Sequence, residues 1–225
     1  MKLMYKSFEA PLEITEGIPN ILVIENKLIR SNFIETLNNQ VQTGEGEIVL
    51  SEANNILKLE KCTEVLINPF CLEMNQKKIV NKLNNSLKEL SIDSNNYAYT
   101  MEVLSKVTLY LEDLSMQLNY PVELGQIEAT DLIKISGAKI DIRTSTFFEN
   151  IINYMCLVAD VLDISLFVTV NLGLFISQTQ IKELFKMANY KNLNLLMIES
   201  SDLIERDLLQ RLTIIDKDMC TIKNY

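Results

Sequence analysis

The segment from Val122 to Glu149 contains five carboxylates whose chemistry suits a hard cation such as Ca²⁺. Glu128 and Asp131, three positions apart, would share one face of a short helix that ends near Gly137. Calcium takes about 6–8 oxygen ligands at about 2.3–2.6 Å, which a loop and a short helix can supply together. We therefore predict metal ligands among Glu123, Glu128, Asp131, Asp141 and Glu149. The alternative is that these acids are solvated charges paired with neighbouring basic residues.

The segment from Asn75 to Leu90 is basic, with four lysines facing the single acid Glu89. On a helix the lysines and several asparagines would form two adjacent rows, on the side away from an apolar stripe. Lysine contacts phosphate and asparagine donates hydrogen bonds, and neither contact to the backbone reads base sequence. We predict DNA contacts at Lys77, Lys78 and Lys82, with a second group at Lys134, Lys139 and Arg143. The alternative is an ordinary solvated helix face.

Several kinds of enzyme are excluded by composition. The chain has no histidine, which removes Ser-His-Asp and Cys-His schemes and the commonest general base. The four cysteines do not have the spacing of a zinc site or of a small disulfide framework; they are Cys62, Cys71, Cys156 and Cys220. We predict no catalytic residues.

The stretch "ILVIENKLIRSNF" is a short strand pattern that runs directly into a helix pattern, which is where a P-loop enzyme holds its nucleotide. Lys27 and Ser31 are present, but no glycine lies between Glu25 and Gln42. Without glycine the backbone N–H groups cannot converge on an anion. We predict no nucleotide site.

The bulk properties indicate a globular protein. Of the 225 residues 48 % are apolar, so a sizeable core is possible, and the net charge of −9 makes the location of positive charge more informative than its sum. No apolar stretch approaches the roughly 20 residues of a membrane helix, and the first residues do not form a signal peptide. We expect a cytoplasmic protein without membrane contact.

Strand and helix patterns alternate at both ends of the chain. Strand-like runs are "KLMYKS", "ILVIE", "EIVL" and "TEVLIN", then "SLFVTVN" and "LNLLMIES", with "LTIID" and "CTIKN" as a closing pair. A helix with Ser177 as its N-cap precedes "LNLLMIES". This alternation predicts a mainly parallel sheet with crossover helices.

The middle of the chain is mostly helical, with apolar stripes of period 3.6 and a third helix from about Thr146 to Leu162. We therefore predict two domains. The first is a discontinuous α/β head, residues 1–72 and 163–225. The second is an inserted α-helical leg, residues 73–162.

Five segments carry a resemblance to a known family: "ILVIEN", "DLIKISGAKID", "TFFENIINYMCLVADVL", "LFVTVNLGLF" and "LNLLMIESSDL", in that order. Together they resemble the small ring-forming, DNA-binding adaptation protein of type II-A CRISPR systems, over nearly the whole chain. The resemblance implies a head related to P-loop ATPases but without their phosphate loop, and an inserted helical leg. It also implies a homotetrameric ring that holds double-stranded DNA ends, Ca²⁺ in the leg, and action beside the integrase and the effector nuclease.

The expected function is therefore non-catalytic, sequence-independent binding of double-stranded DNA during spacer acquisition. Two alternatives remain open on the sequence: a metal-dependent phosphodiesterase that uses the acids from Glu123 to Glu149, and a protein scaffold without DNA contact. The family's calcium segment is usually richer in acids, and Pro121, Gly125 and Gln126 stand here where acids often occur.

Overall fold

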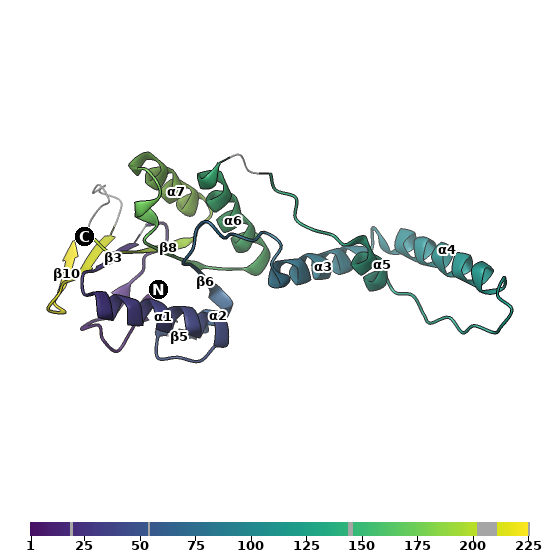
Figure 1. Cartoon of the computed structure of the whole chain (residues 1–225), viewed down its shortest axis with the longest axis horizontal. Coiled ribbons are helices and arrows are strands. Elements are labelled where there is room, and N and C mark those ends of the chain that lie inside the picture. Colours follow the sequence, from purple (N-terminus) through teal and green to yellow (C-terminus); the bar gives the residue numbers. More distant parts are fainter. Residues whose placement is uncertain (19, 54, 144–145, 202–210, 225) are drawn as a thin grey trace. The chain divides into compact units, whose positions relative to one another are not determined.

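The computed structural model describes residues 1–225 apart from 19, 54, 144–145, 202–210 and 225. The chain divides into two compact units (Figure 1). The head unit consists of Met1–Glu73 and Arg143–Tyr225, and the insertion unit consists of Met74–Ile142.

A six-stranded, mainly parallel sheet forms the centre of the head unit, with strand order β10-β9-β3-β8-β7-β6. All neighbouring pairs are parallel except β9 and β10, which form an antiparallel pair at one edge. This confirms the predicted α/β class and the closing pair. The strands are β3 (Asn20–Ile24), β6 (Thr63–Leu66), β7 (Leu166–Val170), β8 (Asn194–Glu199), β9 (Arg211–Ile215) and β10 (Thr221–Asn224).

A second sheet of four short antiparallel strands has the order β2-β1-β4-β5. Only alternate residues of β1 and β4 are buried, such as Leu3 and Leu50. This pattern is typical of an antiparallel sheet with one face on the core. The "KLMYKS" and "EIVL" segments therefore lie outside the parallel sheet. The strands are β1 (Lys2–Met4), β2 (Leu12–Glu13), β4 (Val49–Glu52) and β5 (Asn55–Leu57).

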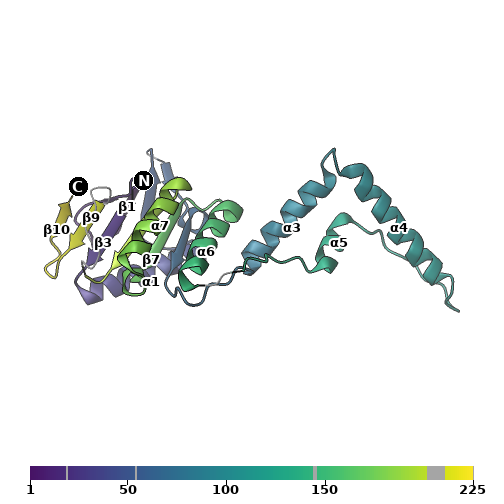
Figure 2. The ribbon, with the colours of Figure 1, turned by 90° about the horizontal axis from the view of Figure 1, so that it is seen from above.

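Helices cover both faces of the parallel sheet, with α1 on one side and α6 and α7 on the other (Figures 1 and 2). One core cluster joins Phe33 and Leu37 of α1 to Leu22 of β3 and Leu196 of β8. These helices are α1 (Lys27–Thr43), α6 (Phe147–Leu162) and α7 (Gln178–Tyr190), with short α2 (Leu59–Cys62) and the 3₁₀ turn η1 (Leu172–Leu174).

Helix α6 belongs to the head unit, whereas the sequence analysis assigned residues up to 162 to the leg. Its inner side, including Ile151, Met155 and Val158, is fully buried. The helical periodicity marks this apolar side but cannot say which unit it packs on. The units divide at Ile142–Arg143 because α6 packs on the sheet side that it shares with α7.

The insertion unit consists of α3 (Lys77–Ile92), α4 (Tyr97–Ser115) and α5 (Ala129–Ser136). Helix α3 packs against both α4 and α5. At the base of this unit, the Asn75 side chain donates to the Ile140 carbonyl at 3.1 Å and accepts from the Ile140 N–H at 2.8 Å. These two bonds hold the ends of the insertion together. No described helix has the length and apolar character needed to cross a membrane.

Candidate nucleic-acid interface

The N-terminal end of α3 concentrates positive charge. Lys77 and Lys78 are its first two residues, and its first turn contains no acidic side chain. The unpaired N–H groups of a helix start already carry a partial positive charge, so stable helices usually place acids there. Here two lysines add to that charge instead. The result is a local site of attraction for anions in an acidic protein.

The lysines lie on the solvent side of α3. Ile79, on the packed side, is 0 % exposed, and Leu83 and Leu87 are half-buried. All four lysines of the helix are exposed: Lys77, Lys78, Lys82 and Lys88. Replacement of the first three would therefore not disturb the packing of α3.

The second predicted group is divided between elements. Lys134 lies in the last turn of α5, which packs against α3, and Lys139 follows that helix. Both are exposed. Arg143 is the first residue of the second head segment. Five of the six predicted DNA-binding residues thus belong to the insertion unit, whose seven lysines face nine acids. The rest of the chain carries most of the net charge of −9.

The structure gives three of the five predicted metal ligands a different role. Glu128 and Asp131 form a capping box at the start of α5, where the Glu128 N–H donates to Asp131 Oδ2 at 3.0 Å. Glu149 similarly accepts from the Thr146 N–H at 3.2 Å at the start of α6, in the head unit. The Thr-x-x-Glu spacing of residues 146 to 149 was the sequence signal for this role.

The remaining two predicted ligands, Glu123 and Asp141, are exposed in segments without regular structure. Among the described residues, no three His, Cys, Asp or Glu side chains gather where they could hold a metal ion. In this structure the five acids are therefore spread over the starts of α5 and α6 and two irregular segments.

The capping box leads to a prediction about calcium. Asp131→Ala removes one acceptor of the box and is expected to lower stability by about 1 kcal/mol. The loss should be equal in calcium and in chelator when thermal melting is followed by circular dichroism. Asp113→Ala, which removes an exposed acid of α4, is the control and should change stability by less than about 0.5 kcal/mol. A calcium-dependent gain in melting temperature that Asp131→Ala abolishes would instead establish an ion site.

At the start of α1, the side chains of Asn26 and Arg30 form hydrogen bonds to nearby backbone groups. Asn26 caps the helix by accepting from the N–H groups of Leu28 at 3.1 Å and Ile29 at 3.3 Å. Arg30 Nη1 donates to the carbonyl of Ile24 at 2.8 Å, at the end of β3. Two first-turn donors that could hold a phosphate, the N–H groups of Leu28 and Ile29, are therefore already paired.

We accordingly expect no ATP binding at millimolar nucleotide. The turn between β3 and α1 lacks glycine, and Asn26 satisfies the amides that a phosphate cradle would need. Isothermal calorimetry with ATP, in the presence and absence of Mg²⁺, measures this directly. Specific, Mg²⁺-dependent heat would contradict the prediction.

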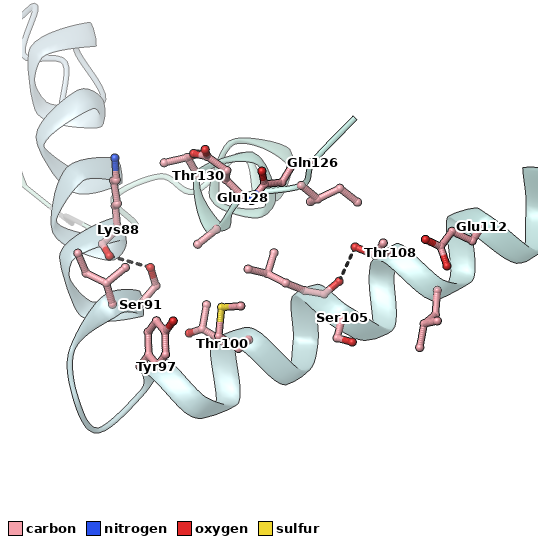
Figure 3. A pocket seen from close by; sticks show the side chains of 16 residues that line it. Lys88, Ser91, Tyr97, Thr100, Ser105, Thr108, Glu112, Gln126, Glu128 and Thr130 are labelled. Carbon is pink, nitrogen blue, oxygen red and sulfur yellow. Dashed lines mark hydrogen bonds between the residues drawn. The ribbon is translucent and has the colours of Figure 1, made fainter. Parts of the chain in front are cut away.

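A groove in the insertion unit was not predicted from the sequence. It has a volume of about 640 Å³ and lies between α3, α4 and the residues that lead into α5. Lys88 and Ser91 border it on one side, Tyr97 and Thr100 on another, and Glu128 on a third (Figure 3). Its lining is mostly apolar, with Ile92, Met101 and Leu104 among the contributors. Helical stripes predict apolar faces but not the gaps between them.

The chain is similar to solved structures and, separately, to a family of protein sequences. Solved structures similar to this chain include a nucleotide-free ATP-binding cassette from an ABC transporter, at 11 % identity and TM-score 0.45, covering 100 % of this chain and 89 % of that one. Another is cbiO1 from Clostridium perfringens, part of the ABC transporter complex cbiONQ, at 11 % identity and TM-score 0.46, covering 91 % and 76 %.

No curated protein matches the sequence. Residues 40–219 match the family described as CRISPR-associated protein (Cas_Csn2). The match covers most of the head unit and the whole insertion unit. It confirms the resemblance found in the sequence. The chain therefore belongs to the Cas_Csn2 family and is a protein associated with CRISPR adaptation.

Proposed function

We propose that this protein binds double-stranded DNA without regard to sequence and without cleaving it, in support of spacer acquisition. The observation that carries the proposal is the start of α3, where Lys77 and Lys78 add positive charge to the positive end of the helix and the first turn contains no acidic residue. Lys82 lies one turn further on and extends the same exposed surface. We call these three lysines the α3 cluster.

The α3 cluster suits phosphate and not bases. Lysine is a flexible point charge, and phosphate contacts position a protein on the duplex without selecting a sequence. Asn81 and Asn85, exposed on the same helix, can add hydrogen bonds to the backbone. Binding should therefore weaken steeply as salt rises.

One copy of so small a cluster cannot hold DNA firmly, and we propose that the chain works as a homotetrameric ring with the cluster facing its hole. The exposed apolar side chains of α4 support self-association: no residue of this helix is fully buried in one chain, and Tyr110 is 62 % exposed. Leu109 and Leu114 are exposed on the same helix. Repeating one weak surface in every copy raises the overall affinity through multivalency.

The proposal includes action in the cytoplasm beside the CRISPR integrase and the effector nuclease, and membership of a CRISPR-associated family supports it. It assigns no residue to contact with these partners. Calcium binding by the acids from Glu123 to Glu149 stays a prediction; three of these five acids form helix caps in this structure. The phosphodiesterase and scaffold alternatives become outcomes of the test.

A gel-shift experiment on linear and covalently closed circular duplex tests the proposal. Linear DNA of unrelated sequences should shift equally, and the closed circle should shift less if the protein threads onto ends. A parallel incubation with Mg²⁺, Mn²⁺ or Ca²⁺ should leave the DNA intact. Cleavage would support the phosphodiesterase, and no shift on either DNA would support the scaffold.

A further inference from the structure

Glu199 is a carboxyl group buried at the end of β8 in the head unit. It is 1 % exposed, and its Oε1 accepts a hydrogen bond from the N–H of Gly173 at 3.0 Å. Its Oε2 is buried and has no hydrogen-bond partner among the described residues. A buried carboxylate with an unpartnered oxygen is costly, so this side chain needs an explanation.

The neighbouring strand contributes two more buried oxygens without partners, Thr169 Oγ1 and Asn171 Oδ1. Strands β7 and β8 run in register, and the N–H of Asn171 donates to the carbonyl of Ile198 at 2.8 Å. Ile198 faces the α1 core, so by alternation Glu199 points to the other face of the sheet. Thr169, next to Val168 and Val170 of that core, points to the same face as Glu199. If Glu199 is ionised, it adds only hydrogen-bond acceptors to this group of buried oxygens. If Glu199 is protonated, its O–H group supplies a hydrogen-bond donor.

No described positive side chain faces Glu199. Strands β3 and β7 and the turn η1 contain no ionisable residue, and Glu25 after β3 is exposed. On α6, Tyr154 is buried, and it donates to Glu64 of β6. The charged residues of α7 are on its exposed side, away from buried Ile181 and Leu184; they are Lys182, Glu183 and Lys186. Burial therefore dominates and raises the pKa of Glu199 to about 7, against the opposing effect of the backbone N–H groups of Gly173 and Leu172.

The turn η1 lies directly on this carboxyl group. A Cβ atom at Gly173 would lie 3.3 Å from the carboxyl atoms of Glu199, so glycine permits the close approach. Asn171, at the start of the turn, has a φ of 51°, in the left-handed region. The turn is thus joined to β8 by two hydrogen bonds, from the Asn171 N–H to the Ile198 carbonyl and from the Gly173 N–H to Glu199.

We propose that Glu199 is held as a neutral carboxylic acid that fastens the turn Asn171–Leu174 to the end of β8, and that its ionisation loosens this turn. The turn leads into Phe175, whose ring meets Phe70 edge-on at 5.1 Å, and Phe70 stacks on Phe147 at 4.6 Å. Loosening therefore reaches an exposed aromatic cluster of the head unit. The contact between Glu199 and this turn therefore responds to pH near neutrality.

The direction of the pH effect follows from the raised pKa. The folded state binds the proton of Glu199 more tightly than the unfolded state, whose pKa is about 4.5. This tighter binding stabilises the fold fully below a pH of about 4.5, and the stabilisation is lost as pH rises through about 7. Glu199→Gln keeps the shape and supplies a permanent donor. The variant should therefore melt several degrees higher than wild type at about pH 8.5, and the difference should shrink toward about pH 5.5.

The control is Glu183→Gln, which removes an exposed glutamate of α7 and should give a difference from wild type that does not change with pH. Carboxyl ¹³C NMR of glutamate-labelled wild type gives a second, independent readout. One signal should titrate with a midpoint near 7 and disappear in Glu199→Gln. If every glutamate titrates below about pH 5.5, Glu199 is ionised and the proposal is wrong. The same holds if Glu199→Gln is equally destabilised at all pH values.

Discussion

Replacement of Lys77, Lys78 and Lys82 by glutamate in one chain is expected to abolish binding to linear duplex DNA. Each phosphate contact that is lost should reduce the slope of log K against log salt by about 0.9. In a homo-oligomer every substitution is repeated in each copy, so the change should exceed that of three contacts. Gel shifts and fluorescence anisotropy over a salt series measure both the affinity and the slope.

The substitutions should spare the fold for a reason that the helix itself supplies. Acids are favourable in the first turn of a helix, because they oppose the partial positive charge of its free N–H groups. Lys77→Glu and Lys78→Glu therefore improve the start of α3 while they reverse its charge. The melting temperature should change little, and its comparison with wild type shows whether a loss of DNA binding could come from unfolding.

A matched control reverses three exposed lysines of the head unit instead, Lys58, Lys61 and Lys217. The change in net charge is identical, so a general repulsion of DNA would affect both variants equally. The control should retain the salt slope of wild type. If the α3 variant binds linear duplex normally while the control does not, the DNA surface lies on the head unit.

Excision of residues 74–142 is expected to leave a folded head that neither binds DNA nor associates. The cut is feasible because Asn75 and Ile140 are joined by two hydrogen bonds, so a short Gly-Ser linker can connect residues 73 and 143. The core cluster that joins α1 to the parallel sheet lies entirely within the head unit. The shortened chain should therefore unfold in one cooperative transition.

Sedimentation and gel shifts compare the shortened chain with wild type. We expect a monomer without measurable affinity for duplex DNA, because the α3 cluster and the apolar side of α4 are both removed. An oligomer of unchanged size would show that the head unit makes the contacts between copies. Retained DNA binding by a monomer would contradict both the ring and the DNA surface that we propose.

The sequence predicted most elements of the head unit, because they follow strong local rules. Ser177 was recognisable as the N-cap of α7, and the short apolar run of β7 is typical of a buried strand. The absence of glycine after Ile24 predicts a helix start that holds no phosphate, and Asn26 caps that start. Strands β2 and β5, of two and three residues, are too short to show any periodicity.

The sequence predicted which residue types the candidate site contains but not how they are arranged in space. Lys77 and Lys78 were recognisable as basic residues, but their place in the first turn, without an acid, depends on where α3 begins. Glu128 is the N-cap of α5 and lies outside the helix, so it does not share a helix face with Asp131; their spacing of three fits a capping box as well as a metal site. Glu199 looks in the sequence like the polar end of a strand. Its burial depends on η1, which only the folded chain brings onto it.

The two bonds between Asn75 and Ile140 also bear on the order in which the chain folds. Strands β6 and β7 are parallel neighbours, with Thr63 opposite Leu166, although the whole insertion separates them in sequence. Closing so long a loop of disordered chain costs entropy that grows with the logarithm of its length and slows non-local pairing. An insertion that folds early brings its own ends together, so that residues 76–139 no longer add to the length of the loop that must close. Its local helices thereby act as a kinetic aid to the sheet that they interrupt.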